Sequence, residues 1–146
     1  MEELIKKYNL QPHIENGSFA ENHYKFEGEG RAPSGSTYYY IAPGERTIFH
    51  TLDCDEYWCY HGGGKCEVWT VNGEGKLNVL DFGLDEESDV TVYLQKGIYF
   101  AARNMGTCGT FFSCITVPRF DYKGLRLFSK QEMLALCPGL KDFYKG

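Results

Sequence analysis

Between residues 36 and 117 the sequence divides into short runs rich in β-branched and aromatic residues, with Gly, Asp and Asn between them. Each run is too short for a helix of ordinary length and has the length of a strand. Eight short strands at this spacing predict an all-β barrel or sandwich. The predicted strands are Thr37–Ile41, Thr47–Leu52, Glu56–Tyr60, Glu67–Val71, Lys76–Leu80, Val90–Leu94, Tyr99–Ala102 and Thr110–Val117.

Helices are expected only at the two ends of the chain. Met1–Leu10 has the pattern of a short amphipathic helix, and a turn-rich segment follows it through Asn16-Gly17. Near the other end, Ser129 to Glu132 form a capping box, and Pro138-Gly139 end the helix that it starts. At 146 residues the chain is expected to form a single domain 1–146, with a barrel core over about 36–128, an N-terminal helix and arm over 1–30 and a C-terminal helix over 129–137.

Composition excludes several kinds of partner. The net charge is −5 without a basic cluster, which argues against nucleic acid as a partner. No apolar run approaches the roughly 18 residues of a membrane span, and the N-terminus lacks the apolar region of a signal peptide, so a cytoplasmic protein with reduced cysteines is expected. The aromatic content of 16% suits strands and the wall of an apolar pocket that holds a small-molecule ligand.

One histidine and one carboxylate stand out in the run from Gly44 to Gly63. His50 and Glu56 share one parity, as do Leu52, Trp58 and Tyr60, so an extended chain directs them to one face. An imidazole and a carboxylate that point into a barrel are suited to acid/base chemistry or supply half of a metal site. His50 and Glu56 are therefore the predicted catalytic residues.

The spacing of Gly44, His50, Glu56 and Gly63 resembles the first signature of the cupin superfamily, G-x5-H-x-H-x3-E-x6-G. Gly97 and Asn104 match the second signature, G-x5-P-x-G-x2-H-x3-N. The resemblance implies a cupin-type β-barrel, or jelly roll, of two antiparallel sheets. In metal-binding cupins four residues of these signatures hold one metal ion, and two of them are here the apolar Leu52 and Phe100. We therefore expect no metal and no other cofactor.

Further blocks resemble a small cupin family of poorly defined function whose members are often described as predicted sugar epimerases. That family usually has histidine after the tryptophan, where this chain has Cys59, and His61 follows two residues later. If a divalent metal is bound after all, the expected ligands are His50, Glu56, Cys59 and His61. The matching blocks span roughly Leu10 to Leu136; they are Asn16–Glu21, Ser36–Tyr40, Phe49-His50 with Asp55–Trp58, Gly97–Arg103, and Cys114–Val117 with Phe120–Tyr122.

The expected ligand pocket combines these motifs. Arg103 follows the strand that carries Phe100, and a guanidinium there is suited to clamp an anionic group. The resemblance also implies ligand contact by Tyr40, and by Glu21 from an arm that crosses the interface of a homodimer. The complete set of predicted ligand-binding residues is Tyr40, Trp58, Tyr99, Phe100, Arg103 and Glu21.

Three functions remain open from the sequence. The first is a metal-independent isomerase or epimerase of a sugar-like or anionic compound, with His50 and Glu56 as acid and base. The second is a metal-dependent cupin enzyme that uses His50, Glu56 and Cys59 or His61. The third is a non-catalytic protein that binds a small molecule. The substrate is not readable from the residues.

Overall fold

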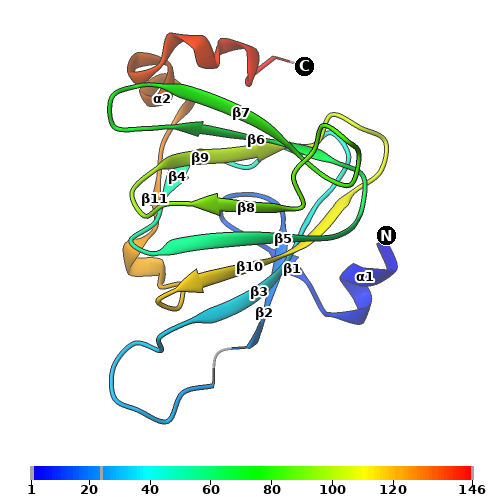
Figure 1. Cartoon of the computed structure of the whole chain (residues 1–146), viewed down its shortest axis with the longest axis vertical. Helices are drawn as coiled ribbons and strands as arrows, with labels where there is room; N and C mark the ends of the chain where they lie inside the picture. The colour runs from blue at the N-terminus through cyan, green and yellow to red at the C-terminus, as the bar shows by residue number, and fades with distance from the viewer. Residues whose placement is uncertain (1, 24, 146) are drawn as a thin grey trace.

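Two antiparallel sheets face each other in the computed structural model, which describes residues 2–23 and 25–145 (Figure 1). Six strands form the first sheet, in the order β1-β2-β3-β10-β5-β8. Five strands form the second sheet, in the order β11-β4-β9-β6-β7. In the first sheet the strands are β1 (Gln11–Pro12), β2 (Ser18–His23), β3 (Gly35–Ile41), β5 (Asp55–Gly63), β8 (Thr91–Leu94) and β10 (Thr110–Val117). In the second they are β4 (His50–Thr51), β6 (Cys66–Val71), β7 (Leu77–Phe82), β9 (Tyr99–Arg103) and β11 (Arg126–Leu127).

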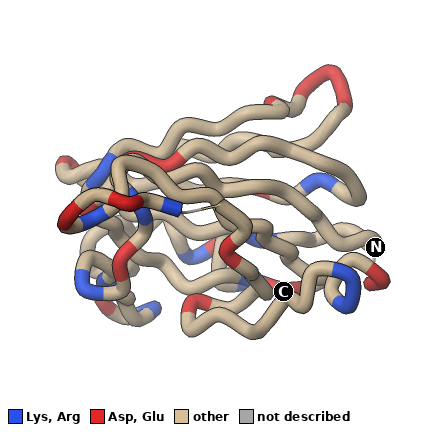
Figure 2. Tube along the Cα trace, turned by 90° about the horizontal axis from the view of Figure 1, so that it is seen from below, with Lys and Arg blue, Asp and Glu red and all other residues tan. Residues whose placement is uncertain are grey.

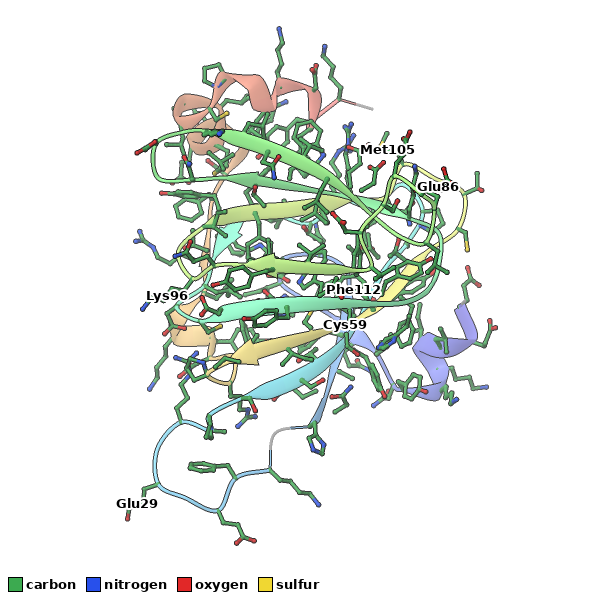
Figure 3. The ribbon with its side chains drawn as sticks, viewed as in Figure 1. Glu29, Cys59, Glu86, Lys96, Met105 and Phe112 are labelled. Atoms are coloured by element: carbon green, nitrogen blue, oxygen red, sulfur yellow. The ribbon has the colours of Figure 1, made fainter. Side chains whose placement is uncertain are left out.

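The main core lies between the two sheets, where the inward-facing side chains of both meet. Figure 3 shows side chains filling this space, with Phe112 of β10 labelled, and Phe112 is fully buried. Trp58 packs against the ring of Phe112 at a centroid distance of 4.4 Å. A strand places alternate residues on opposite faces, so one residue in two of each central strand enters this core.

The ends of the chain cover part of the outer face of each sheet. Helix α1 (Glu2–Lys7) packs on the first sheet, where Leu4, Ile5 and Tyr8 meet a cluster that contains Tyr40 and Phe111. Helix α2 (Lys130–Leu136) and the 3-10 helix η2 (Pro138–Asp142) cover the second sheet. A second 3-10 helix, η1 (Tyr122–Gly124), precedes β11. The helices therefore cover part of each outer face, whereas Tyr57, Tyr93 and Ile115 of the first sheet stay exposed.

The predicted all-β fold with short terminal helices is confirmed. Each of the eight predicted runs contains a strand, although β4 is restricted to His50–Thr51. Helix α2 starts after Ser129, whose side chain caps the backbone of Glu132 as the capping box predicts. Met1 lies outside the described residues, and α1 is shorter than the predicted Met1–Leu10. The sequence reading missed β1, β2 and β11, because their short runs lack an obvious alternation.

A tight turn brings the N-terminal segment back onto the barrel. Asn16 and Gly17 both have φ of +74°, the left-handed conformation that Asn and Gly adopt more readily than other residues. A Cβ atom on Gly17 would lie 2.4 Å from the Tyr39 ring, so a larger residue does not fit there. The turn joins β1 and β2, and it holds the residues before it against the mouth of the barrel.

Charged residues of both signs are interspersed along the chain in Figure 2, in line with the absence of a basic cluster in the sequence. Neither α-helix of the described residues has the length and apolar character of a membrane-spanning helix. The six cysteines are free thiols in the structure.

Candidate functional site

A pocket opens between the two sheets beside the N-terminal segment. The cavity volume is about 30 Å³, more than the roughly 10–15 Å³ that a single ordered water needs. It therefore admits a small polar group of a ligand. The lining side chains with polar or ionisable groups are His13, Glu15, Glu21, Thr37, Tyr39, His50, Glu56, Cys114 and Thr116, and the apolar ones are Phe19, Leu52 and Phe120.

His50 is held by hydrogen bonds at both ring nitrogens. Its Nδ1 lies 2.6 Å from the carbonyl oxygen of Ile48, and its Nε2 lies 2.9 Å from Oε2 of Glu15. Burial acts to lower the pKa of His50, but the charge and hydrogen bond of Glu15 outweigh it and raise that pKa above its ordinary value. His50 and Glu15 thus form a buried imidazolium–carboxylate pair.

Glu15 reaches the site from the turn-rich segment rather than from a barrel strand. Its Oε1 accepts a hydrogen bond of 2.9 Å from the hydroxyl of Tyr39, and its backbone oxygen accepts one of 2.7 Å from the amide of Ile48. Burial would raise the pKa of Glu15, yet His50, His13 and Tyr39 together hold it below its ordinary value. The carboxylate is therefore a fixed negative charge at the base of the pocket.

Glu56 presents a different environment on the facing strand. It is 7% exposed, and its Oε2 is buried without a hydrogen-bond partner among the described residues. Burial and the charge of Glu15 raise the pKa of Glu56 to about 7, while the charge of His50 and the hydrogen-bonding groups of Cys114 and Trp58 act in the opposite direction. A buried carboxyl group that titrates near neutral pH is suited to take and return a proton.

His13 forms part of the pocket wall. Its Nδ1 accepts a 3.2 Å hydrogen bond from the backbone amide of Glu15. The ring packs against Phe19 at 4.4 Å and stacks with Tyr122 at 5.8 Å between centroids. Burial lowers the pKa of His13, and the charge of Glu15 acts against that effect. Because Nδ1 accepts a hydrogen bond from a backbone amide, it carries a lone pair and the ring is a neutral imidazole.

Of the residues predicted from the sequence, His50, Glu56 and Glu21 line this pocket. Glu21 lies at the rim, where its carboxylate pairs with Arg119 at 3.0 Å. Phe100 packs behind His50, with ring centroids 4.1 Å apart, and Trp58 lies deeper in the core, 6.1 Å from Phe100. Phe100 and Trp58 thus support the pocket from behind and are not among its lining residues.

The prediction that Tyr40 lines the pocket is wrong. Tyr40 belongs to the cluster under α1, on the outer face of the first sheet. Its neighbour Tyr39 points inward and donates to Glu15, because successive residues of β3 face opposite sides of the sheet. In a run of three tyrosines, composition does not show which parity is inward.

The prediction that Tyr99 and Arg103 line the pocket is also wrong. They share parity with Ala101 on β9, and this face packs against the C-terminal helices. Tyr99 contacts Phe128 at 5.0 Å between centroids, and Arg103 pairs with Glu67 at 2.9 Å. The two residues are therefore turned away from the pocket by strand alternation.

The alternative metal ligands are not brought together. Cys59 and His61 have the opposite parity to Glu56 on β5, and Nε2 of His61 lies 2.5 Å from Oγ of Ser113, beside the outward-facing ring of Phe111. Among the described residues, no group of three or more His, Cys, Asp or Glu side chains is placed to hold a metal ion. Leu52 and Phe100 lack donor atoms, and Nε2 of His50 faces Glu15. The residues present do not fit the four-ligand metal site of the cupin signatures.

The sequence analysis missed six polar or ionisable residues of the pocket, namely His13, Glu15, Thr37, Tyr39, Cys114 and Thr116. Glu15 lies directly before Asn16-Gly17, and the tight turn was the available sign that its neighbours fold back. Nothing in the local pattern indicates that they reach His50, which is 35 positions further on. Their role follows from the tertiary structure.

The family model described as cupin superfamily (DUF985) matches residues 2–128. The chain therefore belongs to the cupin superfamily (DUF985). A search of curated proteins finds no match. The resemblance to predicted sugar epimerases within the superfamily stays a prediction.

Solved structures show the same fold. Protein SO0799 from Shewanella oneidensis is similar with a TM-score of 0.89 and 26% identity, over 97% of this chain and 92% of that chain. A hypothetical protein from Leishmania major has a TM-score of 0.82 and 22% identity, over 94% and 92% of the two chains. Oxalate decarboxylase from Bacillus subtilis is similar with a TM-score of 0.65 and 16% identity, over 85% of this chain and 33% of that one. The last two likenesses concern the fold alone.

Proposed function

We propose that this cupin is a metal-independent isomerase that moves a proton next to the carbonyl group of a small, neutral, hydroxylated compound such as a sugar. Glu56 takes the proton and returns it. The observation that carries the proposal is the buried Oε2 of Glu56, which lines the pocket without a hydrogen-bond partner among the described residues. An unsatisfied buried carboxylate oxygen is costly, so its presence in a pocket indicates a group that is completed by a ligand.

The charge of the pocket favours a neutral ligand over an anion. Among the described lining residues there is no Lys or Arg, whereas Glu15, Glu21 and Glu56 contribute carboxyl groups. Near the mouth, Arg119 pairs with Glu21 and Arg31 pairs with Asp53 at 2.9 Å, so both cations lie beside acidic partners. Hydroxyl groups can donate to carboxylates, which makes a polyhydroxy compound the better match.

His50 and Glu15 act on the reaction through Glu56. The hydrogen bonds at both nitrogens of His50 leave no ring nitrogen for a substrate. The charge of Glu15 contributes to the raised pKa of Glu56, and a carboxyl group that titrates near pH 7 is a stronger base than an ordinary one. We therefore assign direct proton transfer to Glu56 and a positioning role to the His50–Glu15 pair.

The chemistry requires only one base. Glu56 removes the proton from the carbon next to the carbonyl group, and the electron pair of the broken C–H bond forms a C=C bond while the carbonyl oxygen takes the negative charge. The same carboxyl group then returns the proton to one of the two carbons of this enediolate. The resemblance to predicted sugar epimerases supports this class of reaction, and the fold by itself does not, because cupins share one fold among many functions.

Proton exchange with solvent tests the proposal without knowledge of the natural substrate. The protein is incubated in D2O with a panel of unphosphorylated aldoses, ketoses and hydroxyaldehydes, and deuterium next to the carbonyl group is measured by mass spectrometry. We expect exchange with at least one compound, and we expect Glu56→Gln to slow it by roughly 10²-fold or more. Glu67→Gln, on the outer face, is the matched control and should exchange at the parent rate.

Two outcomes contradict the proposal. Binding of a panel compound without exchange, weakened by Glu56→Gln, supports a non-catalytic binding protein. Exchange that stops after treatment with a chelator and returns on addition of a divalent metal supports the metal-dependent alternative.

A homodimer and a cytoplasmic location stay predictions.

A further inference from the structure

We infer that His13 is a second catalytic residue of this pocket, a neutral hydrogen-bond donor that holds the carbonyl oxygen of the substrate through its Nε2. The inference rests on the proposed function and adds the electrophilic partner that Glu56 requires. A base that removes a proton next to a carbonyl group leaves negative charge on the oxygen, and a donor aimed at that oxygen lowers the barrier.

The first argument is the tautomer of His13. The backbone amide of Glu15 donates to Nδ1 over 3.2 Å, so this nitrogen carries a lone pair and the proton of a neutral ring sits on Nε2. No hydrogen bond engages Nε2 within the described residues. The fold therefore supplies an oriented N–H group that a ligand can use.

The second argument is the position of the ring. His13 lines the same small cavity as Glu56, and His13 is 9% exposed. Phe19, Phe120 and Tyr122 surround its ring at centroid distances of 4.4, 6.0 and 5.8 Å. These three rings hold the plane of the imidazole.

The charges around the ring are compatible with a neutral donor. Glu15 Oε1 lies 3.9 Å from Nδ1, beyond hydrogen-bond distance, and the positive charge of His50 opposes a second imidazolium nearby. Tyr39 and Tyr122 lie beside the ring. The other titratable side chains that line the same cavity are Glu21, Glu56 and Cys114. A neutral imidazole paired with a carboxylate base is a known arrangement for moving a proton between adjacent carbons.

In the balanced step, Glu56 takes the proton from the carbon and the carbonyl oxygen becomes an enediolate oxygen that accepts the hydrogen bond from Nε2–H. When the proton on Glu56 returns to the same carbon, the substrate is regenerated. Isomerisation occurs when the proton of the neighbouring hydroxyl group passes to the first oxygen and Glu56 protonates the adjacent carbon. No oxidant or reductant takes part.

Two substitutions of His13 test the roles of its two ring nitrogens separately. Asn places an oxygen near the Nδ1 position and keeps the acceptor for the Glu15 amide, but it has no donor near Nε2. Gln places its NH2 group near the Nε2 position and keeps a donor. We expect His13→Asn to slow deuterium exchange by roughly 10²-fold and His13→Gln to retain the rate within about tenfold. His61→Asn, which alters the outward-facing histidine beside Ser113, is the control and should leave the rate unchanged.

Nitrogen NMR of the folded protein gives a readout that does not depend on turnover. We expect the ring of His13 to be neutral at pH 7 with its proton on Nε2, and its Nε2 resonance to shift when a panel compound that exchanges is added. A proton on Nδ1, or an imidazolium at pH 7, overturns the inference. The NMR spectrum also shows whether each variant is folded.

The outcomes distinguish this inference from the function on which it rests. Exchange that is lost in Glu56→Gln but unchanged in folded His13→Asn overturns the role of His13 alone. Equal losses in His13→Asn and His13→Gln also overturn it, because a donor at the Nε2 position then makes no difference. No exchange by the parent protein with any panel compound overturns the proposed function and the role of His13 with it.

Discussion

Two ionic pairs lie on opposite faces of the second sheet and differ in how completely they are satisfied. On the outer face, Arg103 donates to Glu67, to the carbonyl oxygens of Asp142 and Phe143, and lies over the ring of Trp69. On the inner face, the His50–Glu15 pair lies in the same pocket as Glu56, which has an unpartnered oxygen. The outer network ties the C-terminal segment to the barrel, and the inner one leaves a polar atom for a ligand.

The comparison explains why a conspicuous arginine is structural and a less conspicuous carboxyl group is the candidate for chemistry. Arg103 uses its guanidinium on protein groups at 2.7 to 3.3 Å. Glu56 remains buried beside another carboxylate, at a cost of roughly 1–3 kcal/mol for an unsatisfied polar atom. Proteins seldom keep such a cost in a core unless the site has a further role.

The largest expected change in the free energy of unfolding comes from a substitution that breaks the His50–Glu15 pair. Glu15→Gln removes the charge that balances His50, so the free energy of unfolding should fall by roughly 3–5 kcal/mol near pH 6, as for other buried pairs that lose one partner. Glu67→Gln on the outer face should cost only about 1–2 kcal/mol, because Glu67 is partly open to water and Arg103 keeps its carbonyl partners. Urea denaturation measures both, and equal losses would contradict the contrast.

The loss of stability in Glu15→Gln should also depend on pH. The pKa of Glu15 is lowered, so its contribution is present above about 4.5 and is lost as pH falls through its folded value. The pKa of His50 is raised, so its contribution is complete below about 6.5 and is lost as pH rises through its folded value. The penalty of Glu15→Gln should therefore be greatest between these limits and should diminish as pH rises through the folded pKa of His50.

The next largest expected effect is an increase in the free energy of unfolding, caused by Glu56→Gln. Glu56 has a pKa of about 7 against an ordinary 4.5, so its ionisation destabilises the folded state increasingly from about pH 4.5 to above pH 7. This difference in pKa corresponds to roughly 3 kcal/mol. Glu56→Gln should raise the free energy of unfolding by up to that amount at pH 8 and change it little at pH 4. Stability that is unchanged at both pH values would show that Glu56 ionises as an ordinary carboxyl group.

The smallest effect compares two neighbouring tyrosines. Tyr39→Phe removes the hydroxyl that lies within hydrogen-bond distance of two acceptors, Glu15 Oε1 and the carbonyl oxygen of Asn16, at an expected cost of about 1–2 kcal/mol. Tyr40→Phe, on the outer face under α1, should change the free energy of unfolding by less than about 0.5 kcal/mol. Thermal unfolding of the two variants measures the difference. A larger loss of stability for Tyr40→Phe would indicate that Tyr40, and not Tyr39, faces the pocket.

The fold and two residues of the candidate site, His50 and Glu56, were readable from local patterns. The strand runs between residues 36 and 117, the capping box at Ser129 and the spacing of His50 and Glu56 all reflect interactions between residues close in sequence. Strand alternation over a few residues was enough to place His50 and Glu56 on the inner face. The same alternation rule, applied to β9, would have predicted that Arg103 and Tyr99 both face outward.

Only the tertiary structure decided which residues complete the pocket. His13 and Glu15 come from a short segment with no strand pattern, and they meet His50 because the Asn16-Gly17 turn folds that segment back onto the barrel. The ionisation of Glu56 likewise depends on the burial and the charge of Glu15 that this fold imposes. Local patterns determined the strands and their faces, since alternation is a property of neighbouring residues. Contacts between distant segments set the charge of the site, because electrostatic energies depend on distance and burial in space and not on separation along the chain.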